Sequence, residues 1–579
     1  MGRTENRLQQ KFDKKLDRAM EHFAAGRLTQ ARSLFEQLHK STPGHPVPLH
    51  MLGFIGFHLG DHDNVIDLIS QAITIAPDYI DAHFNLGNAL MAYGRLNEAI
   101  ASYTKAIALD PNFIEAHENL GDAYSALGNL GDAVASYRRV VAILPDYAEV
   151  YISLGNALFG LDELDEAVAS FAKAIEIKPD YALAHGNLAD VLDKANRTED
   201  LREALIVAKQ NCPDHPRLML GQAQLFKRDG DYAAARAVLE DGSEGVDDAR
   251  FLTARAHLLG DLCDRLDDTD AAFRYFSEGN RRSREAPEAA GIEGQQYLDR
   301  IDGFAERFTP ELIADWQPFE SGDGRPDPVF LVGFPRSGTT LLDTILRSHE
   351  AVTVVEEKPT VNCVREAIER LYRDDPDGRP DLEATHLEAL RQIYFAELDK
   401  YLEPDKRTPI VIDKFPLNLV EAGLISRIFP QSRFLFALRH PCDCVLSGFM
   451  QNLGINEAMA NFLDLEDAAR LYDKVMTLWQ HYQAVLPLQA HTVRYESLIM
   501  ALEETVAPVL DFLGVDWDDG IRNYAKTAHQ RGKINTPSYN QVTQPLYTHA
   551  RGRWERYGEH MQPALPVLLP WVNHFGYGE

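Results

Sequence analysis

The stretch PVFLVGFPRSGTTLL, residues 328–342, decides the fold of the C-terminal half of this chain. Its apolar residues 329–333 predict a buried strand, and the apolar residues from Leu341 onward predict the opening of a helix. The turn between them is rich in glycine and hydroxyl residues. A strand that leads through such a turn into a helix N-terminus directs several backbone N–H groups, and the positive end of the helix dipole, at one point. The stretch therefore predicts a phosphate-binding loop.

The residues within this loop indicate which phosphate ligand it suits. Gly333 and Gly338 have the spacing of the nucleoside-triphosphatase pattern G-x-x-x-x-G-K-[ST], but Thr339 stands in place of its lysine and the cation is Arg336. This loop resembles the 5′-phosphosulfate loop of the tyrosylprotein sulfotransferases and of the bacterial tetratricopeptide-repeat sulfotransferases. The resemblance implies that the loop binds 3′-phosphoadenosine 5′-phosphosulfate (PAPS). A glycine-rich turn without a ligand is the alternative. The residues implied to contact PAPS here are Pro335, Arg336, Ser337, Gly338, Thr339 and Thr340.

Size, charge and cysteine usage limit the classes of partner. A chain of 579 residues should form more than one domain, at about 100–200 residues each. The formal charge of −30 argues against nucleic acid or an anionic membrane as the main partner. No apolar run approaches the ~20 residues that span a bilayer, and the five cysteines show neither a disulfide framework nor zinc spacing. The sequence therefore predicts a cytoplasmic protein that uses no metal and binds neither nucleic acid nor membrane.

A repeat fills the N-terminal half. Prolines recur every 34 residues, and four of them are followed ten residues later by a glycine; these positions are Pro43, Pro77, Pro111, Pro145, Pro179 and Pro213, with Gly53, Gly87, Gly121 and Gly155. This period is the signature of tetratricopeptide repeats, helix pairs in which small residues mark close contacts between helices. We expect about seven units over residues 9–285, with an irregular last unit from about residue 247. The array should coil into a superhelix with a concave face.

Concave faces of such arrays usually bind proteins or peptides, so we expect a protein or peptide acceptor there. The alternative is that the array only stabilises the enzyme or makes it a homodimer. Asparagines on first helices of successive units are candidates for bonds to an extended peptide, or else plain solvated residues; they are Asn85, Asn88, Asn119, Asn156 and Asn187.

The remainder of the chain predicts a linker and an α/β domain. Residues 286–327 read as a helical linker with a turn-rich end. In residues 328–579, the short apolar runs 352–355, 410–412 and 434–438 alternate with helical patterns. This alternation predicts a mainly parallel sheet with ligands at the strand carboxyl ends. The predicted fold class is thus an all-α tetratricopeptide solenoid followed by an α/β P-loop-like domain, which the resemblance identifies as the sulfotransferase fold.

Charged residues end each of these runs. Glu356 and Glu357 end the first, and sulfuryl transfer to a hydroxyl needs a base near the attacking oxygen. The sequence alone does not choose between them; the resemblance implies that Glu357, 21 residues after Arg336, is the catalytic glutamate. A surface acidic pair is the alternative. His349 and His440 are rival bases, each better explained as a turn residue or a neighbour of the cofactor.

Lys414 ends the second run, where its charge can stabilise the transferring group. A structural salt bridge with Asp413 is the alternative. After the third run come Arg439 and, eight residues later, Ser447. An arginine there can make a forked contact with phosphate, and this pair resembles the 3′-phosphate motif of sulfotransferases.

Three later residues enter through the resemblance. It implies that Tyr495 lies near the cofactor, that Ser538 lies beside the sulfonate and that Arg551 can close over the cofactor. The predicted function is PAPS-dependent transfer of a sulfuryl group to an acceptor hydroxyl, catalysed by Glu357, Arg336, Lys414 and Ser538, with adenosine 3′,5′-bisphosphate as product. The alternatives are a repeat scaffold whose nucleotide-binding domain is not catalytic, an ATP-dependent kinase, and a sulfotransferase for glycans or small molecules. The sequence does not identify the acceptor.

Overall fold

The computed structural model describes residues 2–61, 64–213, 215–241, 246, 248–371, 383–402, 408–530 and 551–578. The chain divides into two compact units, residues 1–225 and 226–579. The domain boundaries expected from the sequence, at 285/286 and 327/328, stay predictions.

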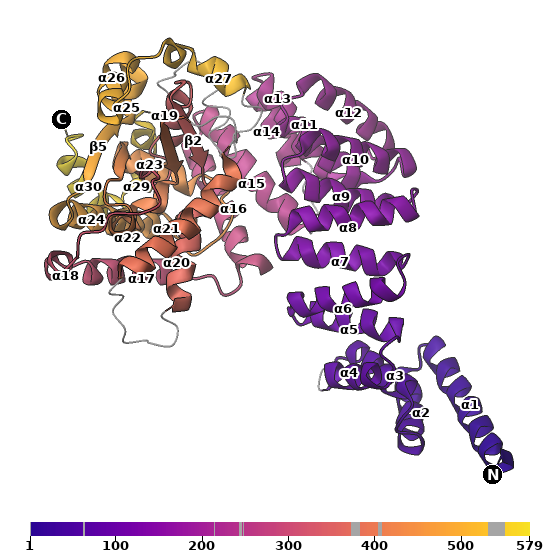
Figure 1. Cartoon of the computed structure of the whole chain (residues 1–579). Helices are drawn as coiled ribbons and strands as arrows, with labels where there is room; N and C mark the ends of the chain where they lie inside the picture. Colours follow the sequence, from indigo (N-terminus) through magenta and orange to yellow (C-terminus); the bar gives the residue numbers. More distant parts are fainter. Residues whose placement is uncertain are drawn as a thin grey trace. The chain divides into compact units, whose positions relative to one another are not determined.

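Paired antiparallel helices build the N-terminal region (Figure 1). Their bounds are α1 (Gly2–Ala24), α2 (Leu28–Ser41), α3 (Pro46–His58), α4 (Val65–Ile75), α5 (Ile80–Ala92), α6 (Leu96–Leu109), α7 (Ile114–Ala126), α8 (Leu130–Ile143), α9 (Ala148–Gly160), α10 (Leu164–Ile177), α11 (Ala182–Lys194), α12 (Thr198–Asn211) and α13 (Pro216–Arg228). The predicted helical repeat is confirmed.

The glycines of the repeat lie where two helices touch. A Cβ added to Gly121 would meet the ring of Tyr137 at 2.5 Å, and one added to Gly87 would meet the ring of Tyr103 at 2.5 Å. Both rings are buried. In these two repeats the aromatic ring of the second helix therefore fills the space that the glycine of the first helix leaves open, which accounts for the small residue at this place in the period.

The asparagines of the first helices bond to neighbouring helices of the array. Asn119 Nδ2 donates to Asn88 Oδ1 at 2.8 Å, and Asn187 Nδ2 donates to Asn156 Oδ1 at 2.9 Å. Asn85 Nδ2 lies 2.8 Å from His50 Nε2. These amides thus link one repeat to the next, a role that neither sequence interpretation included.

The second unit contains the last helical pairs, the connecting segment and the α/β domain. Its helices are α14 (Tyr232–Asp241), α15 (Ala249–Arg265), α16 (Thr269–Glu285), α17 (Gly294–Arg307), α18 (Pro310–Ala314), α19 (Thr339–Leu346), α20 (Thr360–Leu371), α21 (Ala384–Leu398), α22 (Ala422–Ile428), α23 (Pro441–Phe449), α24 (Leu465–Val485), α25 (Tyr495–Met500), α26 (Leu502–Leu513), α27 (Tyr524–Gln530), α29 (Gly558–Met561) and α30 (Leu565–His574). The 3₁₀ helices, labelled η, are η1 (Pro287–Ala289), η2 (Asp399–Tyr401), η3 (Pro416–Leu419), η4 (Met459–Leu463), η5 (Asp519–Asn523) and η6 (Arg553–Tyr557).

A parallel sheet forms the core of this unit. In the described part of the chain its strands are β1 (Val329–Gly333), β2 (Val352–Glu356), β3 (Ile410–Lys414), β4 (Arg433–Leu438) and β5 (Gln489–Arg494), in the order β2-β3-β1-β4-β5. All neighbouring strands pair in parallel. The predicted α/β fold with strands at these runs is confirmed.

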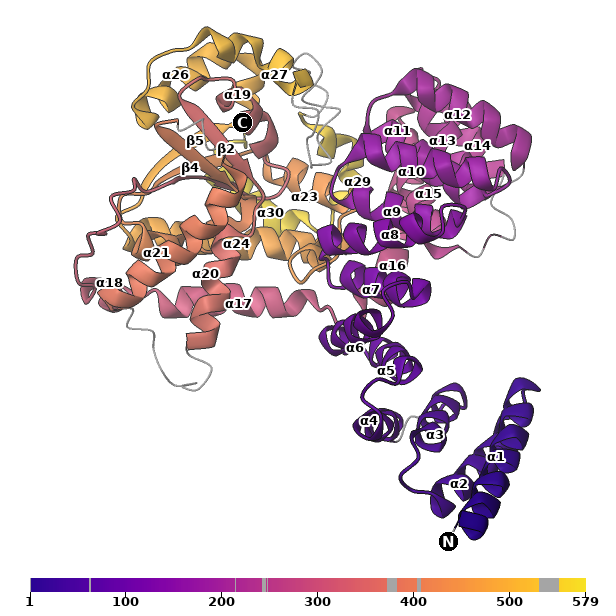
Figure 2. The same cartoon turned by 45° about the vertical axis from the view of Figure 1, so that its right-hand side comes forward.

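Both faces of the sheet are covered. Val329 and Leu331 of β1 pack with α19 and α26, whereas Phe330 and Val332 pack with α21, α22 and α24. Figure 2 shows α26 on one side of the sheet and α21 and α24 on the other. Alternate side chains of a strand point to opposite faces, so a strand that is buried on both faces needs the unbroken apolar run found here.

A buried arginine fixes the chain where it enters β1. The Arg391 side chain of α21 is 1% exposed, and its guanidinium donates to Asp323 at 3.0 Å and to Asp327 at 2.5 Å. A buried guanidinium needs such paired carboxylates. The segment expected to be a turn-rich linker is thus tied to the domain at Asp327, two residues before β1 begins at Val329.

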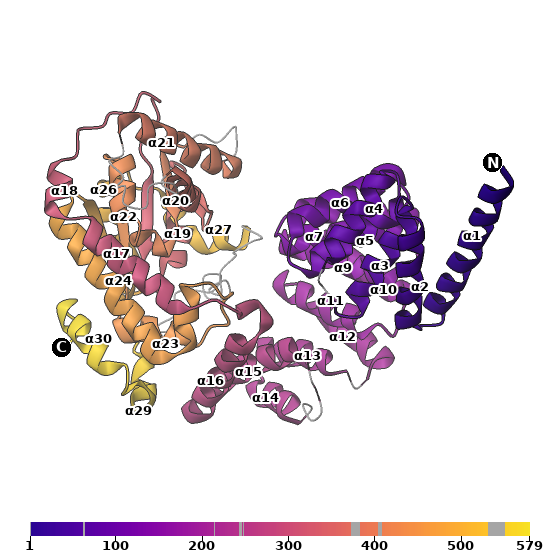
Figure 3. The same ribbon diagram turned by 90° about the horizontal axis from the view of Figure 1, so that it is seen from below.

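Helix pair α15–α16 occupies the place of the irregular last repeat. A Cβ on Gly260 would meet the ring of Phe276 at 2.7 Å, so the pair keeps the glycine–aromatic contact of the earlier repeats. Its helices have 17 residues each, against 13 and 14 in α7 and α8. Figure 3 shows α15 and α16 beside α23 and α29 of the same unit.

Replacing Gly121 by alanine should destabilise the repeats by about 1–3 kcal/mol, since the added methyl group overpacks the contact with Tyr137. Gly131→Ala is the matched control: Gly131 lies in α8 of the same repeat with nothing within 4 Å of an added Cβ, so alanine should stabilise by up to about 1 kcal/mol. Thermal unfolding followed by far-UV circular dichroism measures both. Equal effects of the two changes would contradict this packing interpretation.

Candidate functional site

The turn after β1 brings its backbone close to two neighbouring elements. A Cβ on Gly333 would lie 2.6 Å from the backbone oxygen of Ala437 in β4. Gly338 has a φ of 93°, and a Cβ there would lie 2.5 Å from the Tyr495 ring. Only glycine fits these two places. The predicted loop therefore turns tightly and leads directly into α19, whose first residue is Thr339.

Polar groups of the loop are held inside the domain. Ser337, Thr339 and Thr340 are buried, whereas Pro335 is only partly buried. Among the described residues, no group hydrogen-bonds to the Ser337 hydroxyl oxygen. A buried hydroxyl without a partner is costly unless a ligand satisfies it. Together with the N–H groups at the start of α19, this hydroxyl fits the binding of an anionic group such as phosphate.

Two charged residues at the site have strained backbones. Arg336 has a φ of 73° and Glu357 a φ of 50°. The other positive-φ residues besides glycine in the described part of the chain are asparagines and aspartates, which tolerate this region: Asn64, Asp162, Asn196 and Asp267. Long side chains rarely adopt it, and such strain gathers at functional sites. Backbone geometry thus marks the two residues that the sequence nominated for the loop cation and the base.

Arg336, Arg439 and Ser447 form one cluster. Arg336 Nε donates to the Ser447 hydroxyl at 3.2 Å, and an Arg439 NH group donates to the Arg336 carbonyl oxygen at 3.1 Å. The Arg439 guanidinium also lies 5.0 Å from the centre of the Tyr495 ring, within range of a cation–π contact. The β1 loop and the β4–α23 turn therefore present two guanidinium groups and one hydroxyl together.

Lys414 and the glutamate pair form the second half of the site. The β2–β3 register places Glu356 directly opposite Lys414. Lys414 Nζ lies 2.6 Å from Glu357 Oε1 and 3.2 Å from Glu356 Oε1. Lys414 is fully buried, Glu356 is 9% exposed and Glu357 is 35% exposed. Of the two carboxylates, Glu357 is therefore the one more open to an incoming hydroxyl.

Asp413 does not pair with Lys414, so the alternative of an Asp413–Lys414 salt bridge is wrong. Adjacent strand residues point to opposite faces, and Asp413 instead accepts hydrogen bonds from Thr360 at 2.6 Å and from Tyr394 at 2.8 Å. Complete burial raises the pKa of Asp413 to about 6. Behind the lysine, this carboxyl anchors α20 and α21 to β3.

The two histidines named as rival bases have other contacts. His349 Nε2 lies 2.8 Å from the backbone oxygen of Asp516, and His349 Nδ1 accepts from the Ala351 N–H at 3.0 Å. It is a turn residue. The His440 ring is stacked on the Trp554 ring at 5.3 Å, and burial lowers its pKa.

Of the late residues, Tyr495 lies against the loop, as described above. Arg551 is exposed and immediately precedes Gly552, whose N–H donates to Asp443 at 2.9 Å. Ser538 lies outside the described residues. Asp443, which also accepts from the Trp554 N–H at 3.0 Å, was missed by sequence reasoning. Its only sequence signal was its place between Cys442 and Cys444, directly behind Arg439 and His440.

Among the residues that the structure describes, no group of three or more His, Cys, Asp or Glu side chains could hold a metal ion. No helix among them has the length and hydropathy needed to cross a bilayer.

Comparison with known proteins identifies both regions. Residues 328–519 match the sulfotransferase family, and residues 87–128, 121–162, 155–195 and 187–244 match tetratricopeptide repeat families. The chain thus carries a sulfotransferase-family domain after tetratricopeptide repeats.

Named relatives match about half of the chain or less. Protein-tyrosine sulfotransferase 2 of Gallus gallus is 28% identical over 271 residues, which are 43% of this chain and 69% of that protein. The Drosophila melanogaster protein-tyrosine sulfotransferase is 25% identical, over 43% of this chain and 53% of that protein. An uncharacterized Aquifex aeolicus protein is 26% identical over 54% of this chain, a match that spans 40% of its own length. Among solved structures, MamA is 25% identical, with a TM-score of 0.27 over 28% of this chain and 94% of that chain.

Asp413→Asn should change the dependence of stability on pH. The Asp413 pKa is about 6 when folded against 3.8 as the ordinary value, so the folded chain binds more protons in this window. Stability contributed by this group therefore falls as pH rises, by about 1.4 kcal/mol per pKa unit. From pH 5 to pH 7 the melting temperature of the variant should rise relative to wild type.

Asp518→Asn is the control for this measurement. Hydrogen bonds from the Glu350 and Gly520 N–H groups hold the Asp518 pKa below 3.8, so its contribution is already present at pH 5 and is lost only at lower pH. Its difference from wild type should stay nearly constant from pH 5 to pH 7. A constant difference for Asp413→Asn as well would show that Asp413 does not titrate in this window.

Proposed function

We propose that this chain is a PAPS-dependent sulfotransferase that modifies an acceptor hydroxyl. The observation that carries the proposal is the joint placement, at the carboxyl ends of adjacent parallel strands, of the β1 loop, the Arg336–Ser447–Arg439 cluster and the Lys414–Glu357 pair. The sulfotransferase-family match over residues 328–519 and the relatives named protein-tyrosine sulfotransferase support it.

Each group has a place in this proposal. Residues 335–340 and the start of α19 hold the 5′ end of the nucleotide, and Arg439 and Ser447 hold its 3′-phosphate. PAPS supplies the sulfuryl group: a bond forms between the acceptor oxygen and sulfur, the bond from sulfur to the phosphate oxygen breaks, and adenosine 3′,5′-bisphosphate leaves. Tyr495 supports the loop. Ser538 beside the sulfonate and Arg551 over the cofactor remain parts of the proposal.

Glu357 takes the proton of the acceptor hydroxyl. Its carboxylate is the more exposed of the pair, and the contact with Lys414 holds it in place. Lys414 and Arg336 neutralise charge that develops on the transferring group. Arginine and lysine are thus sufficient for charge neutralisation, and the proposal includes no metal.

The acceptor is proposed to be a tyrosine of a protein or peptide that the repeats bind. The support is the tetratricopeptide match together with the protein-tyrosine sulfotransferases among the relatives. A sugar or small-molecule hydroxyl needs the same base and cofactor, so these acceptors are the alternatives, as is a homodimeric role for the repeats. A cytoplasmic location remains part of the proposal.

Glu357→Gln should bind adenosine 3′,5′-bisphosphate as wild type does but lose sulfuryl transfer by ~10²–10⁴-fold, because it removes the base. Lys414 keeps Glu356 as a partner, so the buried charge stays paired and the domain should fold. Calorimetric titration measures binding, and transfer of label from [³⁵S]PAPS measures turnover. Near-normal turnover in this variant would remove Glu357 from its role; a wild-type chain that does not bind the nucleotide would overturn the proposed function.

Labelling a lysate of the source cells with [³⁵S]PAPS should identify the acceptor class. With the wild-type chain we expect label in proteins, recovered as sulfotyrosine after alkaline hydrolysis, and with Glu357→Gln we expect almost none. Label that migrates as glycan or small molecule would overturn the proposed tyrosine acceptor while keeping the enzyme. Absence of any transfer despite nucleotide binding would favour the scaffold alternative.

A further inference from the structure

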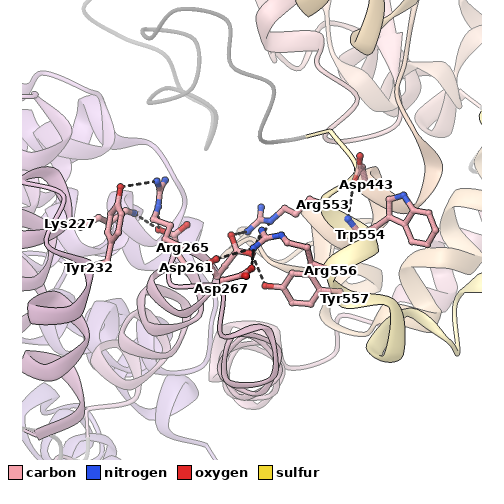
Figure 4. Close-up of polar contacts among 11 residues, drawn as sticks. Lys227, Tyr232, Asp261, Arg265, Asp267, Asp443, Arg553, Trp554, Arg556 and Tyr557 are labelled. Atoms are coloured by element: carbon pink, nitrogen blue, oxygen red, sulfur yellow. Dashed lines mark hydrogen bonds and ion pairs between the residues drawn. The ribbon is translucent and has the colours of Figure 1, made fainter.

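Asp264, on helix α15 of the last helical pair, receives three side chains from the 3₁₀ helix η6. Its carboxylate lies 2.6 Å from an NH group of Arg553, 2.9 Å from one of Arg556 and 2.7 Å from the Tyr557 hydroxyl, which donates to it. Figure 4 shows Arg553, Arg556 and Tyr557 reaching from η6 toward Asp267 and the helices of the last pair. All these residues belong to the second compact unit.

Because the Asp264 contact is buried, its stability depends on all of its partners. Asp264 is 8% exposed and Tyr557 is fully buried. A buried carboxylate needs charged partners and hydrogen bonds that satisfy its oxygens, and removal of one partner leaves the others uncompensated. Asp267, in the next turn of chain, also pairs with Arg556 at 2.8 Å, but its side chain is 78% exposed. Both aspartates therefore pair with Arg556, Asp264 through a buried carboxylate and Asp267 through an exposed one.

The same 3₁₀ helix is held at its other end by the catalytic half. The Asp443 carboxylate of α23 accepts from the backbone N–H groups of Gly552 and Trp554. Asp443 is 1% exposed. The Trp554 ring is stacked on His440, with an interplanar angle of 13°. Helix η6 thus lies between Asp264 and the first turn of α23.

This first turn of α23 belongs to the proposed nucleotide site. His440 directly follows Arg439, and Ser447 lies one turn beyond Asp443. A second contact acts on the far end of the helix: Phe273 of α16 is stacked on Phe449 at 5.1 Å, and Asn280 Nδ2 donates to the Phe449 carbonyl oxygen at 2.9 Å. The last helical pair therefore supports both ends of the helix that carries Ser447.

We propose that Asp264 is a positioning residue for the 3′-phosphate end of the sulfotransferase site: it fixes η6, and η6 fixes the β4–α23 turn that carries Arg439. Asp264 lies outside the family match at residues 328–519. The inference rests on the proposed function. It assigns the last helical pair to the support of nucleotide binding, in addition to any role of the repeats in binding an acceptor.

The test compares Asp264→Asn with Asp267→Asn as matched control in the full chain. Asp264→Asn should raise the Kd for adenosine 3′,5′-bisphosphate and the KM for PAPS by roughly 3- to 30-fold, with kcat within about twofold of wild type. Asp267→Asn should change each by less than about twofold, as expected for an exposed pair. Hydrogen–deuterium exchange of the amides of residues 440–449 should become faster in Asp264→Asn alone.

Tyr557→Phe serves where Asp264→Asn folds poorly, because it removes one donor and keeps both arginines; it should shift Kd in the same direction by a smaller factor. An unchanged Kd and unchanged exchange at residues 440–449 in folded Asp264→Asn would overturn the positioning role. So would faster exchange spread evenly over the whole unit, which indicates a merely structural residue. If the wild-type chain itself binds no adenosine 3′,5′-bisphosphate, the proposed function fails first and the positioning role fails with it.

Discussion

The parallel pairing of β1 with β3 on one side and β4 on the other is the constraint on which the site depends. Strands that run in one direction end at one edge of the sheet, and this brings the β1 loop, Lys414 and Arg439 together from positions up to 106 residues apart in the chain. The register is fixed because each strand buries both faces: a slip by one residue would exchange the aromatic side chains of one core for the aliphatic side chains of the other. The geometry of the charges is therefore set by the packing of apolar residues.

Burial of Lys414 has a consequence for the chemistry. A fully buried ammonium group requires an opposite charge, and both Glu356 and Glu357 supply one. The two glutamates thus share the pairing of Lys414, in addition to the proposed role of Glu357 as base. In the proposed mechanism, the contact between Glu356 and Lys414 persists while Glu357 holds the proton of the acceptor, so the lysine keeps a partner throughout the transfer. Neighbouring residues of an extended strand would point to opposite faces, but both carboxylates reach the same Lys414 Nζ, and the positive φ of Glu357 marks where the backbone departs from the strand conformation.

Local patterns predicted much of this molecule. The apolar run 329–333 and the Gly-rich turn predicted β1, the loop and α19, and the 34-residue period predicted helix pairs with close contacts at the small residues. What the sequence did not show were contacts between distant residues: Asn88 with Asn119, Asp443 with Trp554, Asp264 with Tyr557. The spacing of 31 residues recurs for Asn88 with Asn119 and for Asn156 with Asn187, but the sequence offers no comparable repeat for the other two pairs. The Asp413–Lys414 alternative was a different kind of error, because the alternation of side chains along a strand already argues against it.

The last helical pair shows how one supersecondary unit can serve two purposes. It keeps the packing of a repeat through Gly260 and Phe276, so its interior follows the same rule as the earlier units. Its outer residues differ: Asp264, Asp267 and Asp270 follow one another at intervals of three around the turn from α15 to α16, and they meet Arg553, Arg556 and His560 of the catalytic half. Because these acids pair with basic residues near the C-terminal end of the chain, and because residues 226–285 lie in the same compact unit as the sheet, the pair is structurally part of the unit that contains the sulfotransferase-family domain.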